Sequence, residues 1–240
     1  MKDKEMLLEE HIKELRIKII WVIFVFIFTL VIGFFTATPL IEHLKNDPAA
    51  QDIPWNVFGL TDALSVYLQF AFIISMVFTF PFCLFQLWKY VSPGLSREER
   101  KVTLSFIPAA AGLFVIGLLF AYYFVFPYLV DFMSMMSEKL GTQESYGIRQ
   151  YFRFLINIVF PIGLLFELPV VILFFTYLGV LKPAHLTKFR KVAYLILVLI
   201  AGMVTPPEII SNILVSLPLI ALYECSVWLS RIVYKKKSGN

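Results

Sequence analysis

Long apolar runs separated by short polar segments dominate the pattern of this chain. A helix needs about 20 residues to cross a hydrocarbon core about 30 Å thick, and most of the runs reach that length. The pattern predicts six membrane-spanning helices: Ile17–Thr38, Leu64–Trp88, Leu104–Val130, Phe152–Leu178, Val192–Val204 and Ile209–Leu229. A long loop from Pro39 to Ala63 is expected between the first two spans. We therefore expect an all-α integral membrane protein that forms one domain over residues 1–240.

The C-terminal spans are expected to be short. The fifth run has about 13 residues, so as a helix it would rise only about 20 Å at 1.5 Å per residue. Only residues 205–208 connect it to the sixth run. Either the bilayer thins there or neighbouring helices shield the helix ends.

Prolines inside the predicted spans indicate bent helices. Each one removes a backbone donor and tends to kink its helix. These prolines are Pro81, Pro108, Pro127, Pro161, Pro169 and Pro218. Bent helices can enclose a concave surface, so the sequence predicts a cupped bundle rather than a tight cylinder.

Composition and charge support the membrane assignment and set an orientation. Hydrophobic residues make up 59% of the chain and charged residues 16%, against about 45–50% and about a quarter in soluble domains. Of the 21 lysines and arginines, 17 fall on the side that holds both termini. Because cytoplasmic loops are enriched in these residues, both termini are predicted to be cytoplasmic. The net charge of +4 is therefore a topology signal and does not indicate nucleic-acid binding.

Glu167 lies in the middle of an apolar run with no cation beside it. A carboxylate at the centre of a span costs about 2.5–3.5 kcal/mol on insertion scales, so it faces a polar interior or has a function. One alternative for the whole chain follows from this residue alone: a proton-coupled secondary transporter that uses Glu167.

Two glutamates of the N-terminal segment, Glu10 and Glu14, lie one helical turn apart. Apolar residues from Leu8 to Ile19 recur at helical spacing, while Glu10 and Glu14 share another face, which predicts an interfacial amphipathic helix leading into the first span. The plain structural explanation for Glu14 is an ion pair with Lys18 at i+4.

Glu99 follows a predicted turn at Ser92-Pro93-Gly94. Ser96 and Glu99 have the spacing of a capping box, so a structural role at the start of the third span is one explanation for Glu99.

Two further glutamates lie near the last span. Thr205 and Glu208 fit a helix N-terminus, as N-cap and first-turn acid. Glu224 lies near the cytoplasmic end of the sixth span, and Arg231, two turns later, is a possible partner.

Catalytic motifs are absent from the sequence. It contains no HExxH, GxSxG or P-loop pattern, and no aspartate lies in the middle of a predicted span. We expect a protein that is not an enzyme and that has no metal or other cofactor.

Five motifs then occur in order along nearly the whole chain. They are Glu10-His-Ile-Lys-Glu-Leu-Arg16, Tyr90-Val-Ser-Pro-Gly-Leu95 with Glu99-Arg-Lys101, Phe166-Glu-Leu-Pro169, Thr205-Pro-Pro-Glu208, and Pro218 to Glu224 followed by Ser230-Arg231. Together they resemble the TatC family, the multispan subunit of the twin-arginine protein translocase. The chain departs from the family pattern at Ile12, Tyr90 and Glu208, where leucine, phenylalanine and aspartate are commoner.

The resemblance implies a receptor in the bacterial cytoplasmic membrane for folded precursors whose signal peptides carry consecutive arginines. It implies that Glu14 and Glu99 bind the arginine pair, that Arg16 orients the N-terminal helix, and that Pro93 shapes the loop. Guanidinium groups suit this role because they form forked hydrogen bonds with carboxylates.

The resemblance also implies partners and an energy source. Single-span TatA and TatB subunits are expected near the fifth and sixth spans, together with other copies of the chain. Glu167 is expected on the concave inner face, and Glu167, Glu208 and Glu224 are candidate intramembrane polar or partner contacts. Energy is expected from the proton gradient.

Overall fold

The structure, a computed structural model, describes residues 2–47, 55–95, 97–142, 145–205 and 209–238. Its long helices are α1 (Lys2–Lys45), α2 (Asp62–Val91), α4 (Phe106–Phe120), α5 (Phe126–Lys139), α6 (Ile148–Leu165), α9 (Arg190–Val204) and α10 (Ile209–Ser238). Shorter elements are the 3-10 turn η1 (Ser92–Gly94), α3 (Arg97–Leu104), the π-helical turn η2 (Ala121–Val125), α7 (Leu168–Tyr177) and α8 (Pro183–Lys188).

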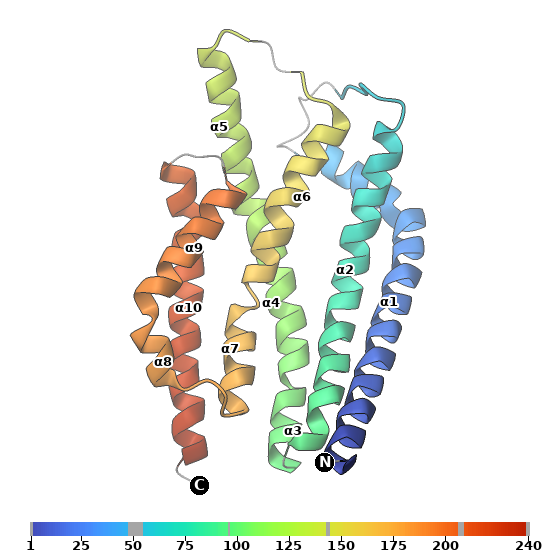
Figure 1. The fold of residues 1–240 in the computed structure, drawn as a ribbon. Coiled ribbons are helices and arrows are strands. Elements are labelled where there is room, and N and C mark those ends of the chain that lie inside the picture. Colours follow the sequence, from blue (N-terminus) through green and yellow to red (C-terminus); the bar gives the residue numbers. More distant parts are fainter. Residues whose placement is uncertain (1, 48–54, 96, 143–144, 206–208, 239–240) are drawn as a thin grey trace.

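The helices stand side by side as a bundle, and α1 begins at the same end at which α10 finishes (Figure 1). We call this end, which also carries α3, the lower end, as it lies in Figure 1. The opposite end, which carries the connection from α5 to α6, is the upper end. The expected all-helical membrane fold is confirmed.

Five helical stretches in the described residues are long and apolar enough to cross a membrane. They are Ile12–Lys45, Asp62–Gly94, Glu99–Lys139, Ile148–Tyr177 and Ile209–Lys235. Helix α9 has only 15 residues. Its rise of about 22 Å is less than the thickness of a hydrocarbon core, about 30 Å. The fifth predicted span, which corresponds to α9, therefore stays a prediction, although this helix is short as expected. The expected shortness of the last span is wrong, because α10 has 30 residues.

The first helix is longer than the sequence pattern predicted. The N-terminal amphipathic segment, the first span and the start of the predicted loop form one helix of 44 residues. Pro39 lies inside this helix, which changes direction in its last part (Figure 1). The loop that the sequence placed from Pro39 onward is therefore wrong for residues 39–45.

The third and fourth predicted spans are interrupted. In the third span, η2 precedes Pro127, which lies in the first turn of α5. In the fourth span, α6 ends at Leu165 and Pro169 lies in the first turn of α7. A proline is tolerated in the first helical turn because the N–H that it lacks would have no intrahelical partner there.

Hydroxyl groups join α1 to α2 within the bundle. Thr29 Oγ1 lies 2.8 Å from Ser75 Oγ and 3.2 Å from Thr79 Oγ1. Ser75 also donates to the carbonyl of Phe26 at 2.8 Å. Such interhelical hydrogen bonds satisfy polar groups that have no access to water in a membrane.

Asp62 fixes the connection at the upper end. Its carboxylate accepts the backbone N–H groups of Phe58 and Gly59 at 3.1 and 2.9 Å, and the guanidinium of Arg149 on α6 at 3.2 Å. Asp62 is 2% exposed. The segment before α2 is therefore tied to the start of α6.

Candidate functional site

Glu14 and Lys18 form an ion pair on α1 near the lower end. The Glu14 carboxylate lies 2.6 Å from Lys18 Nζ, and the Glu14 side chain is 43% exposed to solvent. Lys18 itself is 8% exposed. Its ammonium group lies 5.3 Å from the ring centroid of Tyr90 on α2. The structure thus contains the i,i+4 pair that the sequence indicated, and Lys18 links Glu14 to the end of α2.

A mostly apolar groove adjoins the Lys18 side chain of this ion pair. Its volume is about 150 Å³, and it runs between α1 and α2. Lys18 lines it together with Leu15 and Ile19 of α1 and Leu87 and Tyr90 of α2. The Lys18 side chain therefore lies against mostly apolar side chains.

Glu99 lies on α3, which is anchored to α2. The Glu99 carbonyl accepts the hydroxyl of Thr103 at 2.7 Å, and the Thr103 oxygen accepts Trp88 Nε1–H at 3.0 Å. Trp88 and Thr103 are buried, and the guanidinium of Arg100 lies 5.5 Å from the Trp88 ring centroid. These contacts hold the half-buried Glu99 at a defined place beside α2.

The turn predicted before Glu99 is present. Ser92–Gly94 forms a single 3-10 turn in which the Leu95 N–H donates to the Ser92 carbonyl at 3.1 Å. Pro93 is exposed at the apex of the turn, while Ser92 is buried. Ser96 lies outside the described residues, so the capping box that it would form with Glu99 stays a prediction.

The structure brings the two predicted peptide-binding segments to the same end of the bundle. Tyr90, which contacts Lys18, precedes the turn that leads into α3. The N-terminal part of α1 and α3 both lie at the lower end (Figure 1). Arg16 is exposed on α1.

Glu167 lies at the break between α6 and α7 and is 5% exposed. Its carbonyl accepts the Val171 N–H at 3.0 Å. Its carboxylate oxygen Oε1 is buried and has no hydrogen-bond partner within the described part of the chain. The break places a carboxylate inside the bundle without giving that oxygen a donor.

A cavity of about 120 Å³ adjoins Glu167. Apolar side chains of α2, α4 and α7 line it, among them Trp88 of α2, together with Thr103 of α3. None of its lining residues is cationic.

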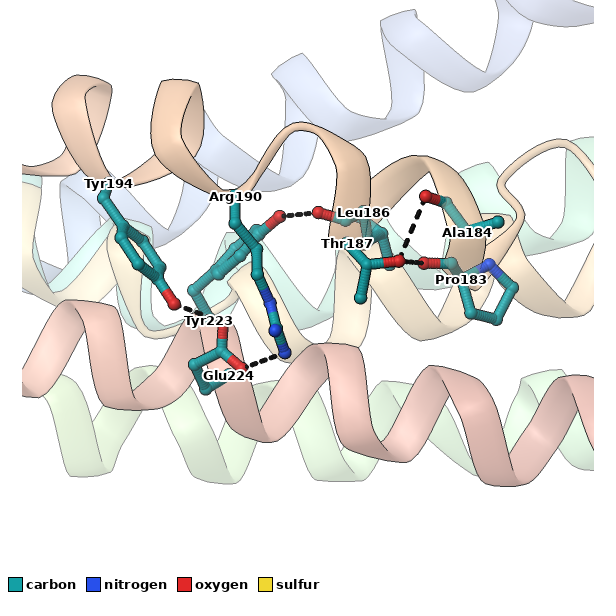
Figure 2. Close-up of polar contacts among 8 residues, drawn as sticks. All are labelled: Pro183, Ala184, Leu186, Thr187, Arg190, Tyr194, Tyr223 and Glu224. Atoms are coloured by element: carbon teal, nitrogen blue, oxygen red, sulfur yellow. Dashed lines mark hydrogen bonds and ion pairs between the residues drawn. The ribbon is translucent and has the colours of Figure 1, made fainter.

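Glu224 on α10 connects to α9 instead of to its own helix (Figure 2). Its two carboxylate oxygens accept Arg190 Nη2–H and the Tyr194 hydroxyl, both at 2.5 Å. The adjacent Tyr223 donates its hydroxyl to the Leu186 carbonyl at 2.8 Å. The suggested partner Arg231 is therefore wrong: two turns along α10 it lies about 10 Å further on, whereas Arg190 reaches Glu224 from the start of α9.

Thr205 directly follows the last residue of α9, and its predicted role as the N-cap of the next helix stays a prediction because residues 206–208 lie outside the described part of the chain. Its backbone N–H and its hydroxyl both donate to the Ala201 carbonyl at 2.9 Å. Glu208, the predicted first-turn acid, lies outside the described residues.

Sequence reasoning missed Arg190 and Tyr194 as partners of Glu224. It placed Arg190 among the cytoplasmic cations and gave Tyr194 no role. Their spacing in the sequence is a weak signal for such a contact. Arg190 and Tyr194 are four residues apart at the start of a short apolar helix, so they lie on one helix face and can bind the same polar group.

These features define the class: a polytopic α-helical membrane protein with polar groups at one end of the bundle and a buried carboxylate inside it. A family model described as Sec-independent protein translocase protein (TatC) matches residues 10–218. The TatC protein of Halalkalibacterium halodurans is 48% identical over 236 residues, covering 98% of this chain and 93% of its own. TatCy of Bacillus subtilis strain 168 is 47% identical over 236 residues, with coverages of 98% and 93%.

The fold is also similar to that of a solved structure. A crystal structure of the twin arginine translocase receptor TatC has a TM-score of 0.78 and 26% identity, covering 93% of this chain and 99% of that chain. The chain belongs to the TatC family, and it is a membrane component of the Sec-independent protein translocase. Membership of this family gives no support to the alternative of a small-solute transporter.

Proposed function

We propose that this chain is the receptor that binds twin-arginine signal peptides of folded precursors at the lower end of the bundle. In this proposal the lower end faces the cytoplasm, both termini are cytoplasmic, and α9 with α10 completes six spans. The excess of lysine and arginine at the predicted cytoplasmic side supports this orientation.

Glu14 and Glu99 are the proposed ligands of the arginine pair. One observation carries the assignment: the Lys18–Tyr90 contact of 5.3 Å joins the Glu14 region of α1 to the segment that leads into Glu99. Carboxylates suit guanidinium groups, which remain charged and form two parallel hydrogen bonds with one carboxylate. Arg16 is proposed to orient the N-terminal part of α1, and Pro93 to shape the loop.

The arginine contacts supply only part of the affinity in this proposal. Exposed ion pairs contribute about 0–1 kcal/mol each. The apolar part of the signal peptide has to add the rest by burial, at about 25 cal/mol per Å². The apolar groove beside Lys18 and the cavity beside Glu167 are the concave surfaces that support this part of the proposal.

Site-specific crosslinking tests the peptide-binding proposal. A photoreactive group beside the arginine pair of a precursor should crosslink to the region of Glu14 and Glu99. Crosslinking should be lost when the arginines become lysines, and it should fall in Glu14→Gln and Glu99→Gln. The matched control is Glu138→Gln, which removes one exposed carboxylate at the upper end of α5. Full crosslinking in both Gln variants would show that the site lies elsewhere.

The partner proposal concerns the C-terminal helices. We place TatA- and TatB-type single-span subunits beside α9 and α10, with several copies of this chain in the assembly and the proton gradient as the energy source. Glu167, Glu208 and Glu224 are the proposed polar contacts. For Glu167 the support is its buried oxygen without a hydrogen-bond partner in the described residues, since a polar group on a partner helix would supply the missing donor.

A further inference from the structure

Lys18 is buried, whereas Lys13 and Arg16, its neighbouring cations on α1, are exposed. Its Nζ atom is buried although few residues in the apolar stretch of this helix are buried within the bundle. Glu14 provides its charged partner at 2.6 Å, and the Tyr90 ring provides a second, weaker contact at 5.3 Å. By contrast Lys13, next to Glu14 in the sequence, is exposed.

A buried ammonium group needs its counter-ion more than an exposed one. Removing the partner carboxylate from a buried ammonium group leaves a charge with less compensation in apolar surroundings. The tether matters as well: Lys18 is one turn from Glu14 on the same helix, so its effective concentration at that carboxylate is high. Any other cation that approaches Glu14 meets a partner already in place.

We propose that Lys18 is an internal competitor for Glu14, which it occupies when no signal peptide is bound and releases when a signal-peptide arginine arrives. This inference rests on the proposed function, because it takes Glu14 as a ligand of the arginine pair. An arginine displaces Lys18 because its guanidinium forms two parallel hydrogen bonds with a carboxylate, whereas an ammonium group acts as a point charge. Lys18 then lowers the affinity of the receptor and eases release of the peptide.

A purely structural role for Lys18 leads to the opposite expectation. If Lys18 only oriented Glu14 for binding, its removal would weaken peptide binding. If it competes, its removal strengthens binding. The sign of the change therefore separates the two roles, and misfolding does not imitate a gain in affinity.

Peptide affinity of the purified full-length chain in lipid nanodiscs provides the test. The variant Lys18→Met keeps an apolar stem in the groove and removes the charge; the control Lys13→Met removes an equal charge from an exposed position. A labelled twin-arginine signal peptide should bind Lys18→Met about two- to fivefold more tightly, in line with the strength of a partly exposed ion pair. Lys13→Met should change affinity less. A twin-lysine peptide should tighten by the same factor as the twin-arginine peptide, because both face the same competitor.

Unchanged or weaker binding in Lys18→Met, or equal tightening in Lys13→Met, overturns the competition. Glu14→Gln separates this failure from failure of the proposed function. If Glu14→Gln binds the peptide normally, the binding site and the competition both fall. If it binds weakly and Lys18→Met shows no gain, only the competition falls.

A second measurement uses the unaltered protein and so does not depend on variant folding. Acylation of lysines by a water-soluble amine reagent, read by mass spectrometry, should be slow at Lys18 without peptide because Nζ is buried. It should accelerate when a saturating twin-arginine peptide displaces Lys18, relative to the exposed reference Lys235. An unchanged relative rate at Lys18 means that the peptide leaves the Glu14–Lys18 pair intact, and it overturns the inference.

Discussion

At the scale of single residues, two buried carboxylates are satisfied to different degrees. Asp62 accepts two backbone N–H groups and one guanidinium, so its role in holding the upper end accounts for its burial. Glu167 keeps one buried oxygen without a partner in the described residues. A buried polar group left unsatisfied costs about 1–3 kcal/mol. The fold therefore gains little from Glu167, which favours a role in contacts that form during transport.

Glu167→Met tests this difference, because methionine has a similar length and no oxygen. The variant should be as stable as the parent chain, or more stable by up to about 1–3 kcal/mol, since the unsatisfied oxygen is gone. Signal-peptide crosslinking should persist while export of a twin-arginine precursor falls. Thermal unfolding in detergent and a cellular export assay measure the two effects. Normal export would remove Glu167 from the transport mechanism.

At the scale of helices, glycines allow close crossings that hydrophobicity does not reveal. A Cβ atom at Gly33 of α1 would lie 2.9 Å from the Ala71 carbonyl oxygen of α2. One at Gly117 of α4 would lie 3.0 Å from Gly163 Cα of α6. Small residues at such crossings bring helices together in membranes, where packing and hydrogen bonds replace the hydrophobic effect. The crossing of α4 and α6 lies just before the helix break that positions Glu167.

Gly117→Ala should therefore destabilise the protein, by about 1–3 kcal/mol for an overpacked contact. The backbone of Gly163 is one of the groups that the new methyl meets, and backbone does not move aside as a flexible side chain does. The control is Gly112→Ala on the same helix, where the new Cβ would meet nothing within 4 Å. Thermal unfolding midpoints of the two purified variants provide the comparison, and equal midpoints would contradict the close crossing.

At the scale of the whole molecule, both described ends of the chain lie at the lower end (Figure 1). Cations cluster on the predicted cytoplasmic side, whereas Glu138 is exposed on α5 towards the upper end. The bundle therefore has a basic end and an end with few cations. Because positively charged loops remain in the cytoplasm, this polarity is expected to orient the molecule in the membrane.

Cysteine labelling from each side of the membrane tests that orientation. In a chain with Cys83→Ser and Cys225→Ser, single cysteines are introduced as Arg97→Cys, Lys235→Cys or Glu138→Cys, all at exposed positions. An impermeant thiol reagent added outside intact cells should label only Glu138→Cys. The other two should react only after the membrane is opened. External labelling of Arg97→Cys or Lys235→Cys would reverse the proposed topology.

Much of the helical framework follows from the sequence, because an apolar run in a membrane satisfies its backbone hydrogen bonds best as a helix. The positions of Pro127 and Pro169 also marked regions where helices are interrupted. The sequence was less informative at Pro39, where it favoured a loop and α1 continues to Lys45. A proline limits a helix locally, but packing against neighbouring segments decides whether the helix continues or ends.

The sequence by itself determined the membrane class, the polar motifs and the local Glu14–Lys18 pair, because these depend on composition and on spacing within one helix. Tertiary structure alone decided that Glu224 pairs with Arg190, that Lys18 lies against Tyr90, and that one oxygen of Glu167 is buried without a hydrogen-bond partner in the described residues. Each of these depends on how far one helix is shifted and rotated relative to another. Periodicity along a single helix carries no record of that shift, since it arises only when side chains of different helices pack together.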